Sequence, residues 1–196
     1  MPRLILLNGA PGSGKSTLAR RLAADPSATA PLALVLDIDV LRGMLGRWFD
    51  TPGEAGMLAR QHALAMIHLQ LRQGRDVIVP QFLGRIDFVL HLADAAAACG
   101  VPFVEIALVS SPDDAASRFR HRSQHPEDQT HRDAAALEAD TSDRIPAMYA
   151  AMMAVAAARP ETHFVESVDG DEAGTHARVV AAIRDAEAAH ARPARQ

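Results

Sequence analysis

The chain has 196 residues, of which 48% are hydrophobic and 22% charged, and its formal net charge is −4. This length and composition predict a single globular domain, residues 1–196, which can bury about 70% of its unfolded surface without disulfides. The only cysteine, Cys99, excludes an intramolecular disulfide and a cysteine metal cluster. The acidic balance disfavours nucleic acid as a partner, and no apolar run approaches the roughly 18 residues of a membrane span. We therefore expect a cytoplasmic protein that does not bind membranes.

An apolar run at residues 4–7 leads into a glycine-rich segment with the pattern G-x-x-x-x-G-K-[ST]. The segment is Gly9-Ala10-Pro11-Gly12-Ser13-Gly14-Lys15-Ser16-Thr17, and a predicted helix, residues 16–24, follows it. A glycine-rich loop between a strand and a helix is typical of a phosphate-binding loop, because its backbone N–H groups and the helix N-terminus can surround a phosphate. We expect this segment to bind ATP, with Lys15 reaching the β- and γ-phosphates and the Ser16 hydroxyl binding Mg²⁺.

Strands and helices are predicted to alternate along the rest of the chain. The further predicted strands are residues 32–36, 77–79, 101–109 and 162–165. The further predicted helices are residues 54–73 with Leu58, Leu64, Ile67 and Leu71 on its apolar face, 85–99, 113–125, 132–158 with a kink at Pro146, and 175–189. This alternation favours an α/β, three-layer fold in which a five-stranded parallel sheet lies between two layers of helices.

Residues 118–150 are predicted to form a small helical lid. Within it, the polar segment 123–131 is typical of a loop that closes over a ligand and excludes water. Arg118 and Arg122 lie four residues apart and would share one helix face. Both could therefore bind ATP, by stacking on adenine or by neutralising the transferred phosphoryl group. A solvated basic helix end is the alternative interpretation.

Two carboxylates, Asp37 and Asp39, follow the predicted second strand, at the end where open α/β sheets bind their ligands. We expect Asp39 to contact the substrate and to act as the base that takes the proton of its hydroxyl. If the strand continued, Asp37 would point to the opposite side from Asp39. We expect Asp37 to support Mg²⁺ through water, or to contact the substrate. Turn formation and helix N-capping are the alternative roles for both residues.

Three further side chains are candidates for substrate contacts. Arg42 lies three residues after Asp39, so on a helix both would face the same side and Arg42 could hold the substrate. Gln81 follows the third predicted strand and is placed near the substrate by that position alone. Trp48 could stack on the substrate or anchor neighbouring helices. A solvated arginine is the alternative for Arg42.

With these residues placed, the chain resembles the small P-loop kinases. The similarity is to the branch with chloramphenicol phosphotransferase, the tunicamycin-resistance ATP-binding protein and the polynucleotide 5′-kinase domain. The residues that carry it are Leu6-Leu7-Asn8-Gly9, Asp39-Val40-Leu41-Arg42, Ile78-Val79-Pro80 and Arg118-Phe119-Arg120-His121-Arg122. The resemblance implies a base at Asp39 and a substrate-binding arginine at Arg42, as in the D-x-x-R element of the polynucleotide kinases. Unlike many P-loop enzymes, the chain has no aspartate at the end of the third strand, where Pro80-Gln81 stand instead.

These features predict an ATP- and Mg²⁺-dependent phosphotransferase that phosphorylates a hydroxyl of a small molecule such as an antibiotic or a nucleoside. Lys15, Asp39 and Arg122 would be the catalytic residues, and adenine is expected near residues 168–171. One alternative is a nucleotide or polynucleotide 5′-hydroxyl kinase. Another is a non-catalytic ATP-dependent protein that sequesters a drug. No pattern in the sequence indicates the oligomeric state.

Overall fold

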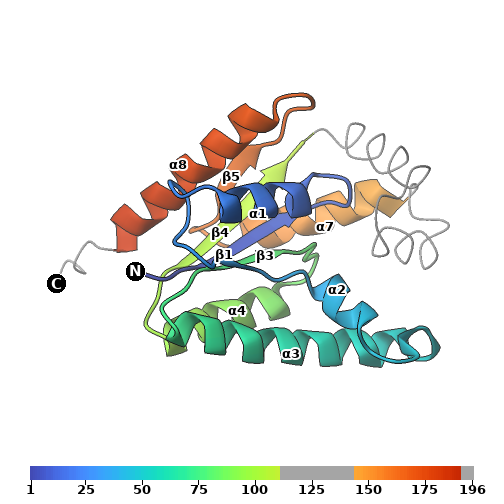
Figure 1. The fold of residues 1–196 in the computed structure, drawn as a ribbon. Coiled ribbons are helices and arrows are strands. Elements are labelled where there is room, and N and C mark those ends of the chain that lie inside the picture. The colour runs from blue at the N-terminus through green and yellow to red at the C-terminus, as the bar shows by residue number, and fades with distance from the viewer. Residues whose placement is uncertain (111–143, 191–196) are drawn as a thin grey trace.

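The computed structural model describes residues 1–110 and 144–190, which form a five-stranded sheet with helices on both faces (Figure 1). In chain order the elements are β1 (Leu4–Gly9), α1 (Lys15–Ala24), β2 (Leu34–Val35), α2 (Ile38–Gly43), the 3₁₀-helix η1 (Trp48–Asp50), α3 (Pro52–Arg72), β3 (Val77–Pro80), α4 (Ile86–Ala98), β4 (Phe103–Val109), α7 (Ile145–Ala157), β5 (His163–Glu166) and α8 (Glu172–His190). The strand order is β2-β3-β1-β4-β5, and all neighbouring strands are parallel. The predicted α/β fold is confirmed. The predicted lid lies outside the described residues, except for residues 144–150 at the start of α7.

The central strand β1 divides the hydrophobic core into two halves. All six of its residues are buried, and successive side chains point to opposite faces of the sheet. Leu4 and Leu6 pack with residues of α3 and α4 on one face. Ile5 and Leu7 pack with residues of α1 and α8 on the other. A single buried strand thereby holds both helical layers in place, and its carboxyl end delivers the glycine-rich loop.

Helix α3 buries a different face from the one that the sequence pattern predicts. Its buried side chains recur at every fourth position and are Ala55, Ala59, Ala63, Ile67 and Leu71. Leu58 is 39% exposed and Leu64 is only half-buried, so the predicted leucine face is wrong at Leu58. Ala59 and Ala63 of this stripe pack in the core with residues of β1 and β3, and the larger Leu58 is turned toward solvent.

The start of β2 and the role of Pro146 also differ from the sequence prediction. Strand β2 begins at Leu34 rather than at residue 32, because Leu32 adopts a left-handed backbone conformation with φ of 65° that no strand accommodates. Pro146 was predicted to kink a helix, yet it lies in the first turn of α7. A proline is tolerated there because the first N–H groups of a helix have no intrahelical acceptor.

A buried ion pair joins the amino-terminal ends of β1 and β3. The Arg3 guanidinium donates to both carboxylate oxygens of Asp76, at 3.2 Å and 2.7 Å, and the backbone N–H of Arg3 donates to the same carboxylate at 2.9 Å. The backbone N–H of Ala30 adds a fourth hydrogen bond to Asp76 at 3.0 Å. The side chains of Arg3 and Asp76 are 10% and 1% exposed, whereas the second partner of Arg3, Glu187, is 39% exposed.

This difference in burial predicts different effects for removing each partner of Arg3. Asp76→Ala should lower the free energy of unfolding by about 3–5 kcal/mol, because it leaves a buried guanidinium without its carboxylate. Glu187→Ala should lower it by less than about 1 kcal/mol, because water replaces the exposed partner. Urea denaturation of the two variants and the parent protein measures both values. Equal losses for the two variants would contradict the proposed importance of burial.

Candidate functional site

The glycine-rich loop has the backbone conformation that its sequence predicts. Gly12 and Gly14 have φ values of 84° and 82°, in the left-handed region where a side chain is strained. At Gly9 a Cβ atom would lie 2.5 Å from Ser13 Oγ and 3.3 Å from Leu108 Cβ, so a side chain there would displace the Ser13 hydroxyl and crowd Leu108. Gly14 is the N-cap of α1, which directs the free N–H groups of that helix into the loop. The loop therefore offers backbone donors and a helix N-terminus to an anion.

The side chain of Lys15 folds back over the loop. Its Nζ donates to the carbonyl oxygen of Ala10 at 2.8 Å and lies 3.4 Å from Ser13 Oγ. A flexible cation with three donors is thereby kept at the loop, in reach of a phosphate that the loop binds. The predicted contact of Lys15 with the β- and γ-phosphates stays a prediction.

Asp37 faces the loop, and its environment disfavours its charge. The Ser16 hydroxyl donates to Asp37 Oδ2 at 3.2 Å, and the backbone N–H of Asp39 donates to Asp37 Oδ1 at 3.0 Å. The second of these bonds makes Asp37 the N-cap of α2. Burial, followed by the neighbouring charge of Asp39, raises the pKa of the Asp37 carboxyl above its ordinary value of 3.8.

The pair formed by Ser16 and Asp37 fits a magnesium ion by the chemistry of its donors. Hydroxyl and carboxylate oxygens are the ligands that Mg²⁺ takes, usually together with phosphate oxygens and water. A cation there would also relieve the unfavourable ionisation of Asp37. Among the described residues, no group of three or more His, Cys, Asp or Glu side chains could hold a metal on its own. The nucleotide would thus have to supply the other ligands.

Asp39 and Arg42 form an ion pair on α2, at 3.1 Å between Arg42 Nη2 and Asp39 Oδ1. They share a side of the helix, as predicted. The expectation that Asp37 and Asp39 lie on opposite sides of a continuing strand is wrong. Residues two apart on a strand face the same side, and the chain is in any case helical from Ile38 on, with Asp37 as the N-cap. Asp37 is therefore directed at Ser16, while Asp39 is held by Arg42.

The ring of Trp48 packs against the guanidinium group of Arg42. The Arg42 guanidinium carbon lies 4.7 Å from the centroid of the Trp48 ring, and Trp48 is 6% exposed. Its ring also stacks on that of Phe49, with the two centroids 3.8 Å apart. Of the two interpretations of Trp48, this geometry favours an anchor over a surface open to substrate. The buried Nε of Arg42 has no hydrogen-bond partner in the part of the chain that the structure describes.

Gln81 and Asn8 lie at the carboxyl ends of β3 and β1. The backbone N–H of Gln81 donates to Leu7 O at 3.1 Å, and its buried Oε1 has no partner among residues 1–110 and 144–190. Asn8 was not among the predicted site residues. Its amide donates to Leu83 O at 3.1 Å and accepts from Leu83 N–H at 2.9 Å, which fixes the segment after β3. The available signal was a polar residue at the end of an apolar strand.

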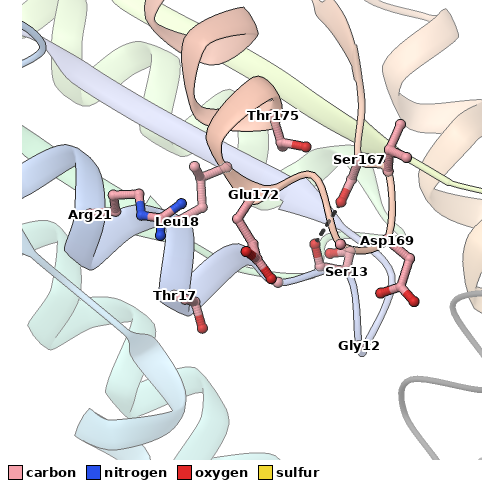
Figure 2. Close-up of a pocket in the computed structure, with 12 residues that line it drawn as sticks. Gly12, Ser13, Thr17, Leu18, Arg21, Ser167, Asp169, Glu172 and Thr175 are labelled. Atoms are coloured by element: carbon pink, nitrogen blue, oxygen red, sulfur yellow. Dashed lines mark hydrogen bonds between the residues drawn. The ribbon is translucent and has the colours of Figure 1, made fainter.

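A pocket of about 170 Å³ lies between the loop, α1 and the segment that joins β5 to α8 (Figure 2). Figure 2 shows Thr17 and Arg21 on the α1 side and Asp169 and Glu172 on the side of the β5–α8 segment. The hydroxyl of Ser167 reaches Ser13 O at 3.4 Å and links the two sides. The pocket includes residues 168–170, where adenine was expected. The predicted ATP clamp, Arg118 and Arg122, lies outside the described residues.

The raised pKa of Asp37 predicts a stabilising substitution. Asp37→Asn keeps a side-chain oxygen for the N-cap of α2 and removes a carboxylate whose ionisation the fold disfavours. The folded state binds this proton more tightly than the unfolded state, so ionisation destabilises the fold above the raised pKa and has no effect below the unfolded value. The variant should melt at a higher temperature near neutral pH, and this advantage should vanish as the pH falls below about 3.8.

Thermal melting of the ligand-free protein between about pH 8 and pH 3.5 measures this effect. Asp94→Asn, at an exposed carboxylate on α4, is the matched control and should change nothing. An advantage of Asp37→Asn that persisted unchanged in acid would show that ionisation of Asp37 is not its cause.

Several solved structures share this fold. The chain aligns with a gluconokinase from Sinorhizobium meliloti 1021 at a TM-score of 0.63 and 20% identity, over 96% of each chain. It aligns with a protein from Chloroflexus aurantiacus J-10-fl at a TM-score of 0.62 and 20% identity, over 94% of this chain and 97% of the other. At these identities the likeness concerns the fold. No curated protein sequence matches the chain.

In the described ranges, no helix combines the length and apolar character that crossing a membrane requires.

A comparison with family models identifies the family of the chain. The model of the AAA_33 family, described as an AAA domain, matches residues 4–145, which is well over half of the chain. The match includes the phosphate-binding loop, Asp37, Asp39 and Arg42. The chain therefore belongs to the AAA_33 family of P-loop domains.

Proposed function

We propose that the protein is an ATP- and Mg²⁺-dependent phosphotransferase whose acceptor is a hydroxyl of a small molecule. The observation that carries this proposal is the hydrogen bond of 3.2 Å between Ser16 of the loop and Asp37 at the end of β2. It joins a phosphate-binding loop to a carboxylate pair at one edge of the sheet, which is the set of groups that phosphoryl transfer requires. The family assignment and the fold shared with a gluconokinase support the same class of activity.

In this proposal the residues from Gly9 to Thr17 bind the phosphates of ATP, and Lys15 neutralises charge on the γ-phosphoryl group. Ser16 and Asp37 would hold Mg²⁺, which when bound shields the phosphate oxygens from an approaching nucleophile. The pocket beside residues 168–170 takes the adenine ring. Arg118 and Arg122 are proposed to clamp ATP on the strength of the sequence pattern.

Asp39 is the proposed base. It takes the proton of the acceptor hydroxyl while the hydroxyl oxygen forms a bond to the γ-phosphorus. The bond from that phosphorus to the β–γ bridging oxygen breaks, and ADP leaves with the electron pair. Arg42 orients Asp39 through their ion pair of 3.1 Å and can hold the acceptor, and Gln81 is proposed as a further acceptor contact. Asp37 is the next candidate for the base.

An antibiotic or a nucleoside is the acceptor suggested by the resemblance to the resistance-type kinases. Mass spectrometry of the protein with ATP, Mg²⁺ and a panel of hydroxyl compounds tests this point. Transfer adds about 80 Da to the acceptor. Transfer to 5′-hydroxyl oligonucleotides alone would favour a polynucleotide kinase. Tight ATP and drug binding without any mass change would favour a sequestering protein.

Two substitutions separate nucleotide binding from transfer. Lys15→Ala should lower ATP affinity or turnover by about 100-fold or more, because it removes the cation at the phosphates. Asp39→Asn should leave the Kd of ATP unchanged and lower the transfer rate by about 10²–10⁴-fold, because it removes the base. Calorimetric ATP binding and a coupled ADP assay measure the two quantities.

Asp50→Asn is the matched control for Asp39→Asn. Asp50 forms an exposed ion pair of 2.6 Å with Arg47, at the same three-residue spacing as Asp39 and Arg42. This variant should transfer phosphate at the parent rate. A parent rate for Asp39→Asn would exclude Asp39 as the base and direct attention to Asp37.

The metal assignment makes a separate prediction. Asp37→Asn should raise the Mg²⁺ concentration for half-maximal turnover by about tenfold, because a neutral amide is a weaker ligand than a carboxylate. A Mg²⁺ titration at saturating ATP measures this shift, with Asp94→Asn again as the control. An unchanged Mg²⁺ dependence would remove Asp37 from the metal site.

A further inference from the structure

A second cleft of about 690 Å³ lies apart from the nucleotide pocket, between α3, the segment after β3, α4 and α7. Its volume is in the range of small-molecule binding sites. Much of its wall is apolar, with Leu64, Phe82, Phe88 and Met148 among its lining residues. A ligand with a ring or another apolar body would bury that surface.

Three arginines from different elements line this cleft. They are Arg60 of α3, Arg85 immediately before α4 and Arg144 immediately before α7. The guanidinium carbon of Arg60 lies 5.5 Å from the centroid of the Phe88 ring, which restricts its position. Asp87 is the single carboxylate among the described lining residues.

These three arginines differ from the arginines that form ion pairs elsewhere in the described structure. Five arginines face a carboxylate: Arg3, Arg42, Arg47, Arg159 and Arg178. Within residues 1–110 and 144–190, by contrast, no ion pair engages Arg60, Arg85 or Arg144. Among the described lining residues, three guanidinium groups face one carboxylate, Asp87, and this local excess of positive charge attracts an anion even though the chain as a whole carries a net charge of −4.

The cleft is coupled to the phosphate-binding loop at two points. Asn8, directly before the loop, forms both of its side-chain hydrogen bonds with Leu83 of the cleft wall. Ala10 of the loop packs on Ile145, the residue after Arg144. The cleft wall itself is tightly packed at Gly84, where a Cβ atom would lie 2.9 Å from the Phe82 ring and 3.3 Å from Ala151 Cβ.

We infer that this cleft binds the phosphoryl acceptor and that the acceptor carries an anionic group, a carboxylate or a phosphate ester, on an apolar or ring-shaped body. Arg60, Arg85 and Arg144 bind the anion, because guanidinium groups form paired hydrogen bonds with either group. Phe82 and Phe88 contact the body, and the hydroxyl lies toward the ends of β1 and β3. This inference rests on the proposed phosphotransferase function and narrows its substrate class.

The test compares acceptors that differ in one anionic group. Phenyl glucuronide and phenyl glucoside form the carboxylate pair, and adenosine 3′-monophosphate and adenosine form the phosphate pair. We expect kcat/KM of the full-length protein with ATP and Mg²⁺ to be at least about tenfold higher for the anionic member of at least one pair. The pair with the larger ratio identifies the anion. Equal values within both pairs would overturn the inference.

Substitution of the three arginines tests whether a preference for anionic acceptors depends on the cleft. Arg85→Gln and Arg144→Gln alter exposed side chains and should each raise KM for the anionic acceptor by about tenfold, with kcat and the KM of ATP unchanged. Arg60→Gln tests the half-buried member, with its melting temperature as the check on folding. Arg72→Gln, an exposed arginine at the other end of α3, is the matched control and should have no effect. A preference unaffected by all three cleft variants would overturn the inference.

Direct binding separates failure of this inference from failure of the proposed function. Calorimetry with the same four compounds needs no turnover. Arginine-dependent binding of an anionic compound without phosphoryl transfer would support the cleft and contradict the phosphotransferase. Transfer that favours neutral acceptors would contradict the cleft and support the phosphotransferase. A strong preference for an oligonucleotide over adenosine 3′-monophosphate would overturn the small-molecule assignment.

Discussion

The hydrogen bonding of β1 between β3 and β4 is the constraint on which the remaining structure depends. A strand in this position has no edge exposed to water, and both of its faces must be apolar. Leu4 and Leu6 serve one helical layer, while Ile5 and Leu7 serve the other. The loop that follows is consequently held at the middle of the sheet's carboxyl edge, where the ends of β2, β3 and β4 can contribute residues to it.

Polar residues secure both ends of this buried strand. At its amino end, Arg3 and Asp76 form a buried ion pair that ties β1 to β3. At its carboxyl end, Asn8 pairs with the backbone of Leu83. Each satisfies groups that would be costly to bury alone. The contacts of Asn8 also position the loop and the segment after β3 relative to each other, so at this end of the strand the same interactions serve stability and site geometry.

The site has two sides with different chemistry. The loop, α1 and the β5–α8 segment line the proposed nucleotide pocket, which lies at the N-terminus of α1. The other side is built by α3, the segment after β3, α4 and α7, and its lining includes two phenylalanines and three arginines. Asp37 and Asp39 lie on α2 and its N-cap, next to Ser16 of the loop. Their different partners, Ser16 for Asp37 and Arg42 for Asp39, support the proposed division of roles, in which Asp37 serves a metal ion and Asp39 the acceptor.

The sequence by itself determined the phosphate-binding loop and the parallel α/β fold, because both depend on contiguous residues: glycines with special backbone angles and short apolar runs between helices. It did not determine that Asp37 caps α2, that Leu58 is exposed, that Asn8 holds Leu83 or that Trp48 supports Arg42. The sequence also did not show that Arg60, Arg85 and Arg144 line one cleft. The exposure of Leu58, the Asn8–Leu83 contact and the arginine cleft depend on the packing of elements far apart in the chain, which no local pattern encodes. The Asp37 cap and the Trp48–Arg42 contact are local, but they depend on where α2 begins, which the sequence left open between a strand and a helix.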